Sequence, residues 1–220
     1  MQNTAHPIPR PEGLSQDSTA SVFTELYRAC VNLCVWQRPL PGAVHTYSEF
    51  LLTHYPYATE IRLTGNVATL SRELPQQLPR HPQGTAFIDD ICALADMLTC
   101  LLAASAIGLR LCVASQATCP RFHVDRLGCR LITTYHGPAT EWLDNQDVNR
   151  DKLGRGANGK ADSESGLYTA AAAVQSMAAG EVALLKGESW PGNEGRGIVH
   201  RSPPLPAKQK RLFLTMDAIS

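Results

Sequence analysis

The clearest hydrophobic pattern in the chain lies between residues 85 and 104. Its apolar positions recur at the spacing of one face of an α-helix; they are Ile88, Ile91, Leu94, Ala95, Leu98, Leu101 and Leu102. Thr85 can cap the first turn, and Asp89 and Asp90 suit the positive end of the helix dipole. The pattern predicts a helix whose apolar stripe belongs to the core.

The residues before this helix predict weaker elements. The apolar positions of residues 21–36 fit one helix that ends before Pro39 and Pro41, and residues 48–52 fit a short helix. Residues 61–70 are typical of a strand or a turn-rich segment, and the prolines at 75, 79 and 82 predict a loop. Residues 1–20 are rich in Pro, Ser, Thr and Gln, which predicts a flexible tail.

From Gly108 onward the pattern changes to short segments typical of strands. They cover residues 109–114, 121–125, 130–135, 140–143, 181–186, 197–200 and 211–216. The alanine-rich residues 168–179 predict a helix, and the polar, glycine-bearing residues 144–166 predict an exposed loop or lid. The result is an α+β protein with one domain over residues 21–220, comprising a mainly helical layer (21–105) and a β-rich half (106–220).

Composition and charge narrow the functional classes. Twenty basic and twenty acidic residues cancel, which disfavours a nucleic-acid partner because such partners usually require a basic excess. Polar residues interrupt the longest apolar run, so no membrane span is expected. The odd count of seven cysteines and the absence of a recognisable signal segment favour reduced thiols and a cytoplasmic protein. The expected partner is a small-molecule or protein substrate.

One short motif carries the chemistry. His123 and Asp125 stand two residues apart on a predicted strand, so both side chains point to the same face and can bind one metal ion. His200, much later in the chain, can supply a third ligand. Two imidazoles and one carboxylate form the facial triad of non-haem Fe(II) sites, which leaves positions open for substrates. In a double-stranded β-helix, or jelly roll, such residues meet at one end of the barrel.

The order of the surrounding segments resembles the prolyl hydroxylase-like oxygenases that use Fe(II) and 2-oxoglutarate. The similar stretches are Arg130–Tyr135, the Gly137–Trp142 turn and Gly180–Gly187. The resemblance implies that Arg211, on the strand after the distal histidine, binds the far carboxylate of 2-oxoglutarate, and that Tyr135 or Thr133 donates to this cosubstrate. It also implies a jelly roll with the N-terminal helices packed on it.

The chain also resembles a bacterial family known as domain of unknown function 1826. The similar stretches are Cys119–Asp125, Thr134–Trp142, Leu184–Trp190 and His200–Pro204, together with the helix around Asp89–Ile91. This family names no reaction, so the mechanism depends on the residues themselves.

Several alternatives stay open at this point. A lone histidine is more often a core or surface residue than a ligand, and Asp125 could form an ion pair with Arg121 or Arg126. Arg211 follows Lys208 and Lys210, so it could belong to a solvated face. Cys119 could be a fourth, soft ligand, which would favour Zn(II) and a protein for metal storage, sensing or delivery.

Overall fold

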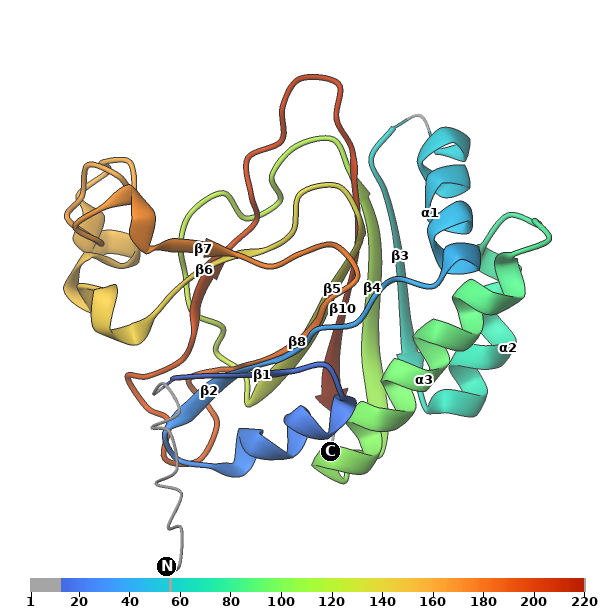
Figure 1. Ribbon diagram of the computed structural model, residues 1–220, viewed down its shortest axis with the longest axis horizontal. Coiled ribbons are helices and arrows are strands. Elements are labelled where there is room, and N and C mark those ends of the chain that lie inside the picture. The colour runs from blue at the N-terminus through green and yellow to red at the C-terminus, as the bar shows by residue number, and fades with distance from the viewer. Residues whose placement is uncertain (1–12, 56, 220) are drawn as a thin grey trace, which may run out of the picture.

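A seven-stranded sheet is the largest element of the computed structural model, which describes residues 13–55 and 57–219 (Figure 1). Its strand order is β1 (Gly13–Asp17), β2 (Val31–Trp36), β8 (Val182–Lys186), β5 (Cys129–His136), β10 (Arg211–Ile219), β4 (Ala106–Ala114) and β3 (Thr59–Gly65). The β1–β2 pair is parallel and the other pairs are antiparallel. A second sheet has the order β7 (Val174–Ser176), β6 (Glu141–Leu143) and β9 (Val199–Arg201).

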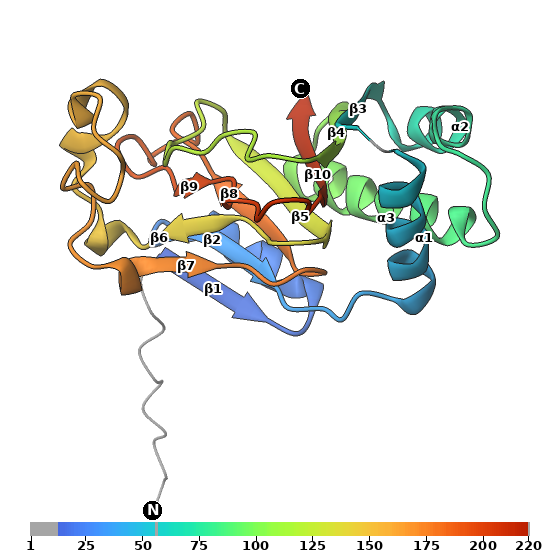
Figure 2. The same cartoon turned by 90° about the horizontal axis from the view of Figure 1, so that it is seen from above.

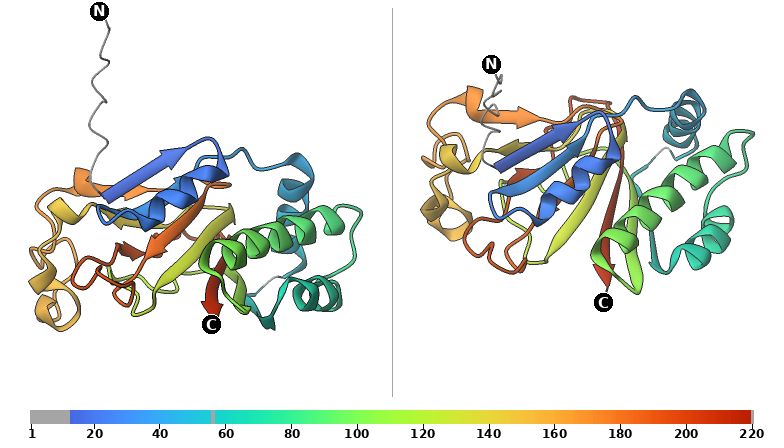
Figure 3. Two further views of the ribbon diagram at one scale, coloured as in Figure 1. Left: turned by 90° about the horizontal axis from the view of Figure 1, so that it is seen from below. Right: turned by 60° about the horizontal axis from the view of Figure 1, so that its bottom comes forward.

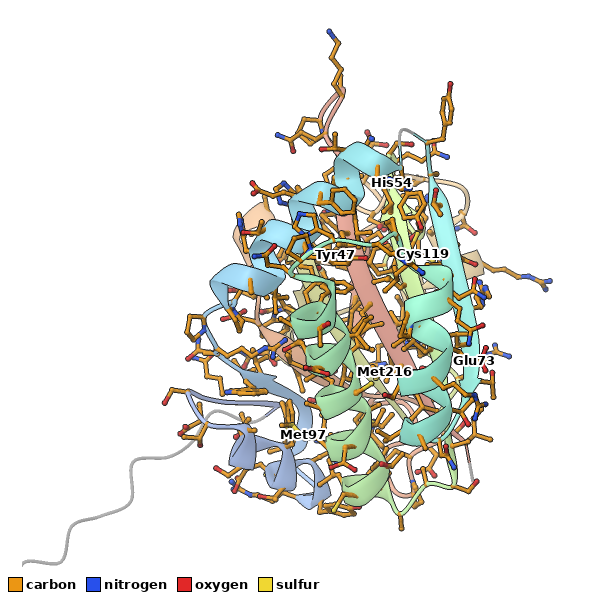
Figure 4. The ribbon with its side chains drawn as sticks, turned by 90° about the vertical axis from the view of Figure 1, so that its right-hand side faces the viewer. Tyr47, His54, Glu73, Met97, Cys119 and Met216 are labelled. Atoms are coloured by element: carbon orange, nitrogen blue, oxygen red, sulfur yellow. The ribbon has the colours of Figure 1, made fainter. Side chains whose placement is uncertain are left out.

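Helices cover one face of the large sheet. They are the 3₁₀ helix η1 (Ala20–Tyr27) and the α-helices α1 (Gly42–His54), α2 (Val67–Gln77) and α3 (Gly84–Leu102). Figure 3 shows η1 and α3 on this face, and Figure 4 looks onto α1, α2 and α3 with Met216 of β10 behind them. Figure 2 shows β6 and β7 at the opposite end of the molecule from α1 and α2. The predicted α+β class is therefore confirmed. No helix in the described ranges is long and apolar enough to cross a membrane.

Two apolar layers hold this arrangement together. The larger one packs the helices on the large sheet and includes Phe87, Ile91, Leu131, Leu214 and Met216, all fully buried. The smaller one lies on the other face of the large sheet, between it and β6, and includes Leu33, Ile132 and Trp142. The large sheet is therefore buried on both faces in its centre.

The stripe between residues 85 and 104 forms α3, as predicted. Ile91, Leu94 and Leu98 are buried on it. The cap prediction is wrong, since the helix begins at Gly84 and Gln83 precedes it without a side-chain cap. Asp90 has a tertiary role instead: its carboxylate binds the Arg38 guanidinium at 2.5 Å and accepts a hydrogen bond from the Tyr135 hydroxyl at 2.9 Å.

The helix predicted for residues 21–36 is wrong over its second half. Residues 20–27 form η1, but Val31–Trp36 form β2, which pairs with β8. Val31 and Cys34 pack in the helix-side layer, and Leu33 and Val35 pack in the other. A strand that is buried on both faces has a continuous apolar run, which periodicity alone does not distinguish from a buried helix.

The flexible tail predicted for residues 1–20 is wrong from Gly13 onward. Gly13–Asp17 form β1, which pairs with β2, and residues 1–12 lie outside the described ranges. Residues 21–105 are likewise not only helical, because β2 and β3 belong to the large sheet.

Two other predicted segments differ from the structure. Residues 168–179 contain a short 3₁₀ turn, η5 (Ala171–Ala173), and the strand β7. Pairing of β7 with β6 outweighs the helix propensity of alanine, which is a weak preference. Residues 61–70 divide between β3 and α2, whose N-cap is Asn66: its side chain accepts from the Thr69 N–H. Pro75 lies within α2 and not in a loop.

The contacts of Asp90 with Arg38 and Tyr135 give a test of the helix-side core. Asp90→Ala would leave Arg38 as an uncompensated buried charge and Tyr135 without its acceptor. We expect the free energy of unfolding to fall by about 3–5 kcal/mol, measured by urea denaturation. Asp96→Ala, an exposed position on the same helix, is the matched control and should change it by no more than about 0.5 kcal/mol. Equal effects of the two variants would contradict this account.

Candidate metal centre

His123, Asp125 and His200 meet at one point, as the sequence predicted. Each offers one ligand atom, and the three atoms lie within 4.8 Å of one another. The Asp125 carboxylate lies 3.8 Å from His123 Nε2 and 3.5 Å from His200 Nε2. The side chain of His200 is 6% exposed, that of Asp125 is 13% exposed and that of His123 is 34% exposed. The group is thus open to solvent on the His123 side only.

A single pair of residues brings the two histidines together. His123 and His200 form an isolated antiparallel bridge, in which each main-chain N–H donates to the other's carbonyl at 3.0 Å. Residues 121–125 therefore form no extended strand, contrary to the prediction. The reason is local: the Phe122 N–H donates to the Asp162 carboxylate at 2.8 Å and not to a neighbouring strand.

Hydrogen bonds fix the tautomer of both imidazoles. His123 Nδ1 lies 2.9 Å from the Arg121 carbonyl, and His200 Nδ1 lies 3.1 Å from the Ile198 carbonyl. A carbonyl only accepts, so Nδ1 must carry the proton in each ring. Burial lowers the pKa of His200 to about 4, which keeps its ring neutral at pH 7. Both Nε2 lone pairs are therefore free to bind a metal ion, an arrangement typical of histidine ligands.

Asp125 is oriented by an arginine that sequence reasoning did not single out. Arg130 Nη1 donates to Asp125 Oδ2 at 2.9 Å, while its Nε and Nη2 donate to the two carboxylate oxygens of Asp217 at 2.8 Å. The two hydrogen bonds to Asp217 hold the Arg130 guanidinium in place, and the guanidinium in turn orients the Asp125 carboxylate. The ion pairs of Asp125 with Arg121 or Arg126 are not formed, and Arg130 takes their place.

The loop between β6 and β7 of the second sheet also supports the site. Residues 144–166 contain three short 3₁₀ turns, η2 (Asn145–Asp147), η3 (Arg150–Lys152) and η4 (Gly154–Ala157), and much of the segment is exposed. Asp162 is buried, however, and binds the Arg121 guanidinium at 2.7 Å as well as the Phe122 N–H. The segment is therefore anchored beside His123, which its composition alone did not indicate.

Arg211 faces the same cavity as the two histidines. It lines that cavity together with His123, Arg130, Thr140 and His200. Only 2% of Arg211 is exposed, so the solvated-face alternative is wrong. Its Nη2 donates to Thr134 Oγ1 at 3.0 Å and to Thr140 Oγ1 at 2.7 Å.

The charge of Arg211 has no carboxylate to balance it. Arg110, Arg130 and Arg201, which line the same cavity, pair with Glu60, Asp125 and Glu141, respectively. Within the described ranges no carboxylate lies at ion-pair distance from Arg211, and burial lowers its pKa to about 10. A buried cation is costly unless it is paired. The cavity therefore presents a positive charge suited to an anion next to the His/Asp/His group.

Thr133 and Tyr135 are not among the residues that line this cavity, so the structure gives no support to their predicted roles. Thr133 pairs with Leu214, which faces the helices, and its hydroxyl donates to the Glu181 carbonyl. Tyr135 is buried among the helices, in contact with Phe87 and Asp90. Their neighbour Thr134 faces the cavity instead. A strand's side chains alternate, so an error of one residue changes the face.

Cys119 is exposed and lies at the cavity edge. It is not one of the three residues whose ligand atoms come within 4.8 Å of one another. The structure thus gives no support to a four-ligand zinc site that includes this thiol.

The fold and the donor set together define an α+β protein with a His/Asp/His candidate metal centre. Within that class, the chain belongs to the family described as protein of unknown function DUF1826, whose model matches residues 17–217. The family resemblance found in the sequence is therefore confirmed.

Solved structures with the same fold include enzymes of low sequence identity. The rice dioxygenase for auxin oxidation superposes with a TM-score of 0.55 at 12% identity, covering 96% of this chain and 83% of the rice chain. A full-length Neurospora crassa protein, crystallised with alpha-KG and 5-formyluracil, gives 0.50 at 10% identity, covering 94% and 83%. No protein with a curated description matches the chain. These likenesses establish the fold and leave the reaction to the site.

Arg130 provides a test of the centre that leaves all three ligands in place. Arg130→Leu removes the group that orients Asp125, so we expect metal affinity to fall by about 10–100-fold. The measurement is a Mn(II) titration followed by electron paramagnetic resonance. Arg62→Leu, an exposed arginine that contacts Glu60, is the control and should leave the affinity unchanged. An unaltered affinity in Arg130→Leu would show that Asp125 needs no such support.

Proposed function

We propose that this protein is an oxygenase that uses Fe(II) and 2-oxoglutarate to oxidise an as yet unidentified substrate. The observation that carries the proposal is the buried, uncompensated charge of Arg211 in the cavity of the His/Asp/His group. Metal ligands alone would fit many functions. A cation held beside them without a carboxylate calls for an anionic ligand that also reaches the metal.

The residues fit 2-oxoglutarate in both of its parts. His123 Nε2, Asp125 and His200 Nε2 would hold Fe(II), and a triad of this type leaves open positions for a keto acid and O2. Arg211 would bind the far carboxylate, because a guanidinium forms two parallel hydrogen bonds to a carboxylate. Its contacts with the hydroxyls of Thr134 and Thr140 would keep the guanidinium in place.

The protein's own groups perform the remaining tasks. Bound Fe(II) with 2-oxoglutarate supplies the power to activate O2. The bridge between His123 and His200 sets the spacing of the ligands, Arg130 orients Asp125, and the apolar layer around Ile132 and Trp142 borders the cavity. The exposed side of His123 is the side from which a substrate would approach.

The fold supports the same proposal. The two facing sheets, with the ligands between them, correspond in this proposal to the double-stranded β-helix of such oxygenases. The likeness to the rice dioxygenase for auxin oxidation agrees with it. The identity of the metal as iron and not zinc belongs to the proposal as well, since the donor set accepts both.

The test is an anaerobic titration of the Fe(II)-loaded protein with 2-oxoglutarate, followed by the visible metal-to-ligand charge-transfer band. We expect a band in the wild-type protein. Arg211→Met removes the charged partner of the 2-oxoglutarate carboxylate, and the loss of such a buried pair costs about 2–5 kcal/mol of binding free energy. We therefore expect 2-oxoglutarate to bind this variant at least about 30-fold more weakly. Fe(II) should still bind, because the three ligands are untouched.

Stability measurements separate this outcome from misfolding. Arg211→Met replaces a buried unpaired charge with an apolar side chain, so its free energy of unfolding should be equal to or higher than that of the wild type. Arg62→Met is the matched control for the titration. A wild-type protein that binds Fe(II) but gives no band and no affinity for 2-oxoglutarate would overturn the proposal, and would favour a metal-binding role without turnover.

A further inference from the structure

A second group of metal-binding side chains lies on the other face of the large sheet. It consists of His45, Glu49 and His136, whose ligand atoms lie within 4.8 Å of one another. His45 Nδ1 is 3.6 Å from Glu49 Oε2, and the rings of His45 and His136 have centroids 6.1 Å apart. We call these three residues the α1–β5 cluster.

Two local features create the cluster. His45 and Glu49 are four residues apart on α1, so they lie one helical turn apart on the same face. His136 reaches them because of a β-bulge: Thr134 pairs with Phe213, but His136 pairs with Leu212, so Tyr135 is the extra residue. The bulge places both Tyr135 and His136 on the helix side, where Leu212 also packs.

The rest of α1 gives the cluster a rigid frame. Val44, Tyr47 and Leu51 are buried and pack α1 into the helix-side layer, while His45 and Glu49 stay exposed. The Lys210 ammonium donates to the carbonyls of Leu52 and Tyr55 at 2.7 and 2.8 Å, which ties the helix end to the segment before β10. Figure 4 shows α1 with Tyr47 directed towards α3 and His54 at the end of the helix.

The donor set suits a transition metal such as Zn²⁺ better than Ca²⁺ or Mg²⁺. Two imidazole nitrogens and one carboxylate oxygen suit Zn²⁺, and ligand distances of about 2.0–2.2 Å need only small side-chain rotations from the present separations. The side chains of His45 and Glu49 are 50% and 55% exposed, so the rotations are unhindered and water can complete the coordination. The mainly carboxylate and carbonyl oxygen sets of Ca²⁺ and Mg²⁺ are absent from the cluster.

We propose that the α1–β5 cluster binds Zn²⁺, separately from the His123/Asp125/His200 centre. The ion would link α1 to the end of β5, two residues after Thr134. The ion would also lie near Arg211, because the next residue, Gly137, packs against the residue before Arg211. Gly137 has a φ of +87°, and a Cβ there would be 2.6 Å from the Lys210 carbonyl. Zinc bound at the cluster would therefore stabilise the segment that positions the Arg211 guanidinium.

The test is a Zn²⁺ titration by calorimetry on protein without a histidine tag. We expect two equivalents in the wild-type chain. His45→Ala and His136→Ala should each bind one equivalent, and the double variant His123→Ala/His200→Ala should retain the equivalent bound at the cluster. His45→Ala should fold normally, because alanine favours an exposed helix position. Zn²⁺ should raise the Tm of the double variant, and a further His45→Ala change should abolish that rise.

His54→Ala is the matched control, since this exposed histidine lies on the same helix outside the cluster. It should bind two equivalents, as the wild type does. The proposal is overturned if His45→Ala and His136→Ala leave the stoichiometry unchanged, or if His54→Ala removes the same equivalent. Because the readout is zinc stoichiometry at a separate site, its result is independent of the 2-oxoglutarate titration.

Discussion

The two main-chain hydrogen bonds between His123 and His200 hold together segments that lie far apart in the sequence, and the candidate centre depends on this contact. A hydrogen-bonded antiparallel pair fixes the distance between its two residues. The imidazoles therefore face one another with their Nε2 atoms near Asp125. Neighbouring interactions stabilise both segments of this pair. The Asp162 carboxylate accepts a hydrogen bond from the Phe122 N–H, and β9, which contains His200, pairs with β6.

The arginines around this contact differ in how their charges are paired. Each other arginine lining the cavity has a carboxylate partner. Among the described residues Arg211 has the hydroxyls of Thr134 and Thr140 and the ring of Phe213 as partners, but no carboxylate. Burying an unpaired cation costs stability, and the surrounding sheet and its two apolar layers must offset that cost. Such a cost is expected at a binding site, where a group is kept ready for a ligand and not for the fold.

The two faces of β5 have separate roles, and the bulge at Tyr135 is the reason. Arg130 contacts Asp125 and Thr134 contacts Arg211 on the side of the candidate metal centre, while Tyr135 and His136 contact the helical layer. Without the extra residue, strict alternation would return His136 to the cavity side together with Thr134. The bulge thus places Thr134, which contacts Arg211, and His136, which belongs to the α1–β5 cluster, two residues apart on one strand.

The sequence by itself determined part of the secondary structure and the residue set of the candidate metal centre. The stripe that forms α3 was readable because it depends on residue type and short spacing. His123, Asp125 and His200 were readable because imidazoles and carboxylates are typical metal ligands and the first two stand two residues apart. Tertiary structure alone decided that residues 31–36 are a strand, that Thr134 and not Thr133 faces the cavity, and that Arg130 orients Asp125. These outcomes depend on which distant strand pairs with which, and on one bulge, and such non-local pairings leave no periodic signal in the residues that make them.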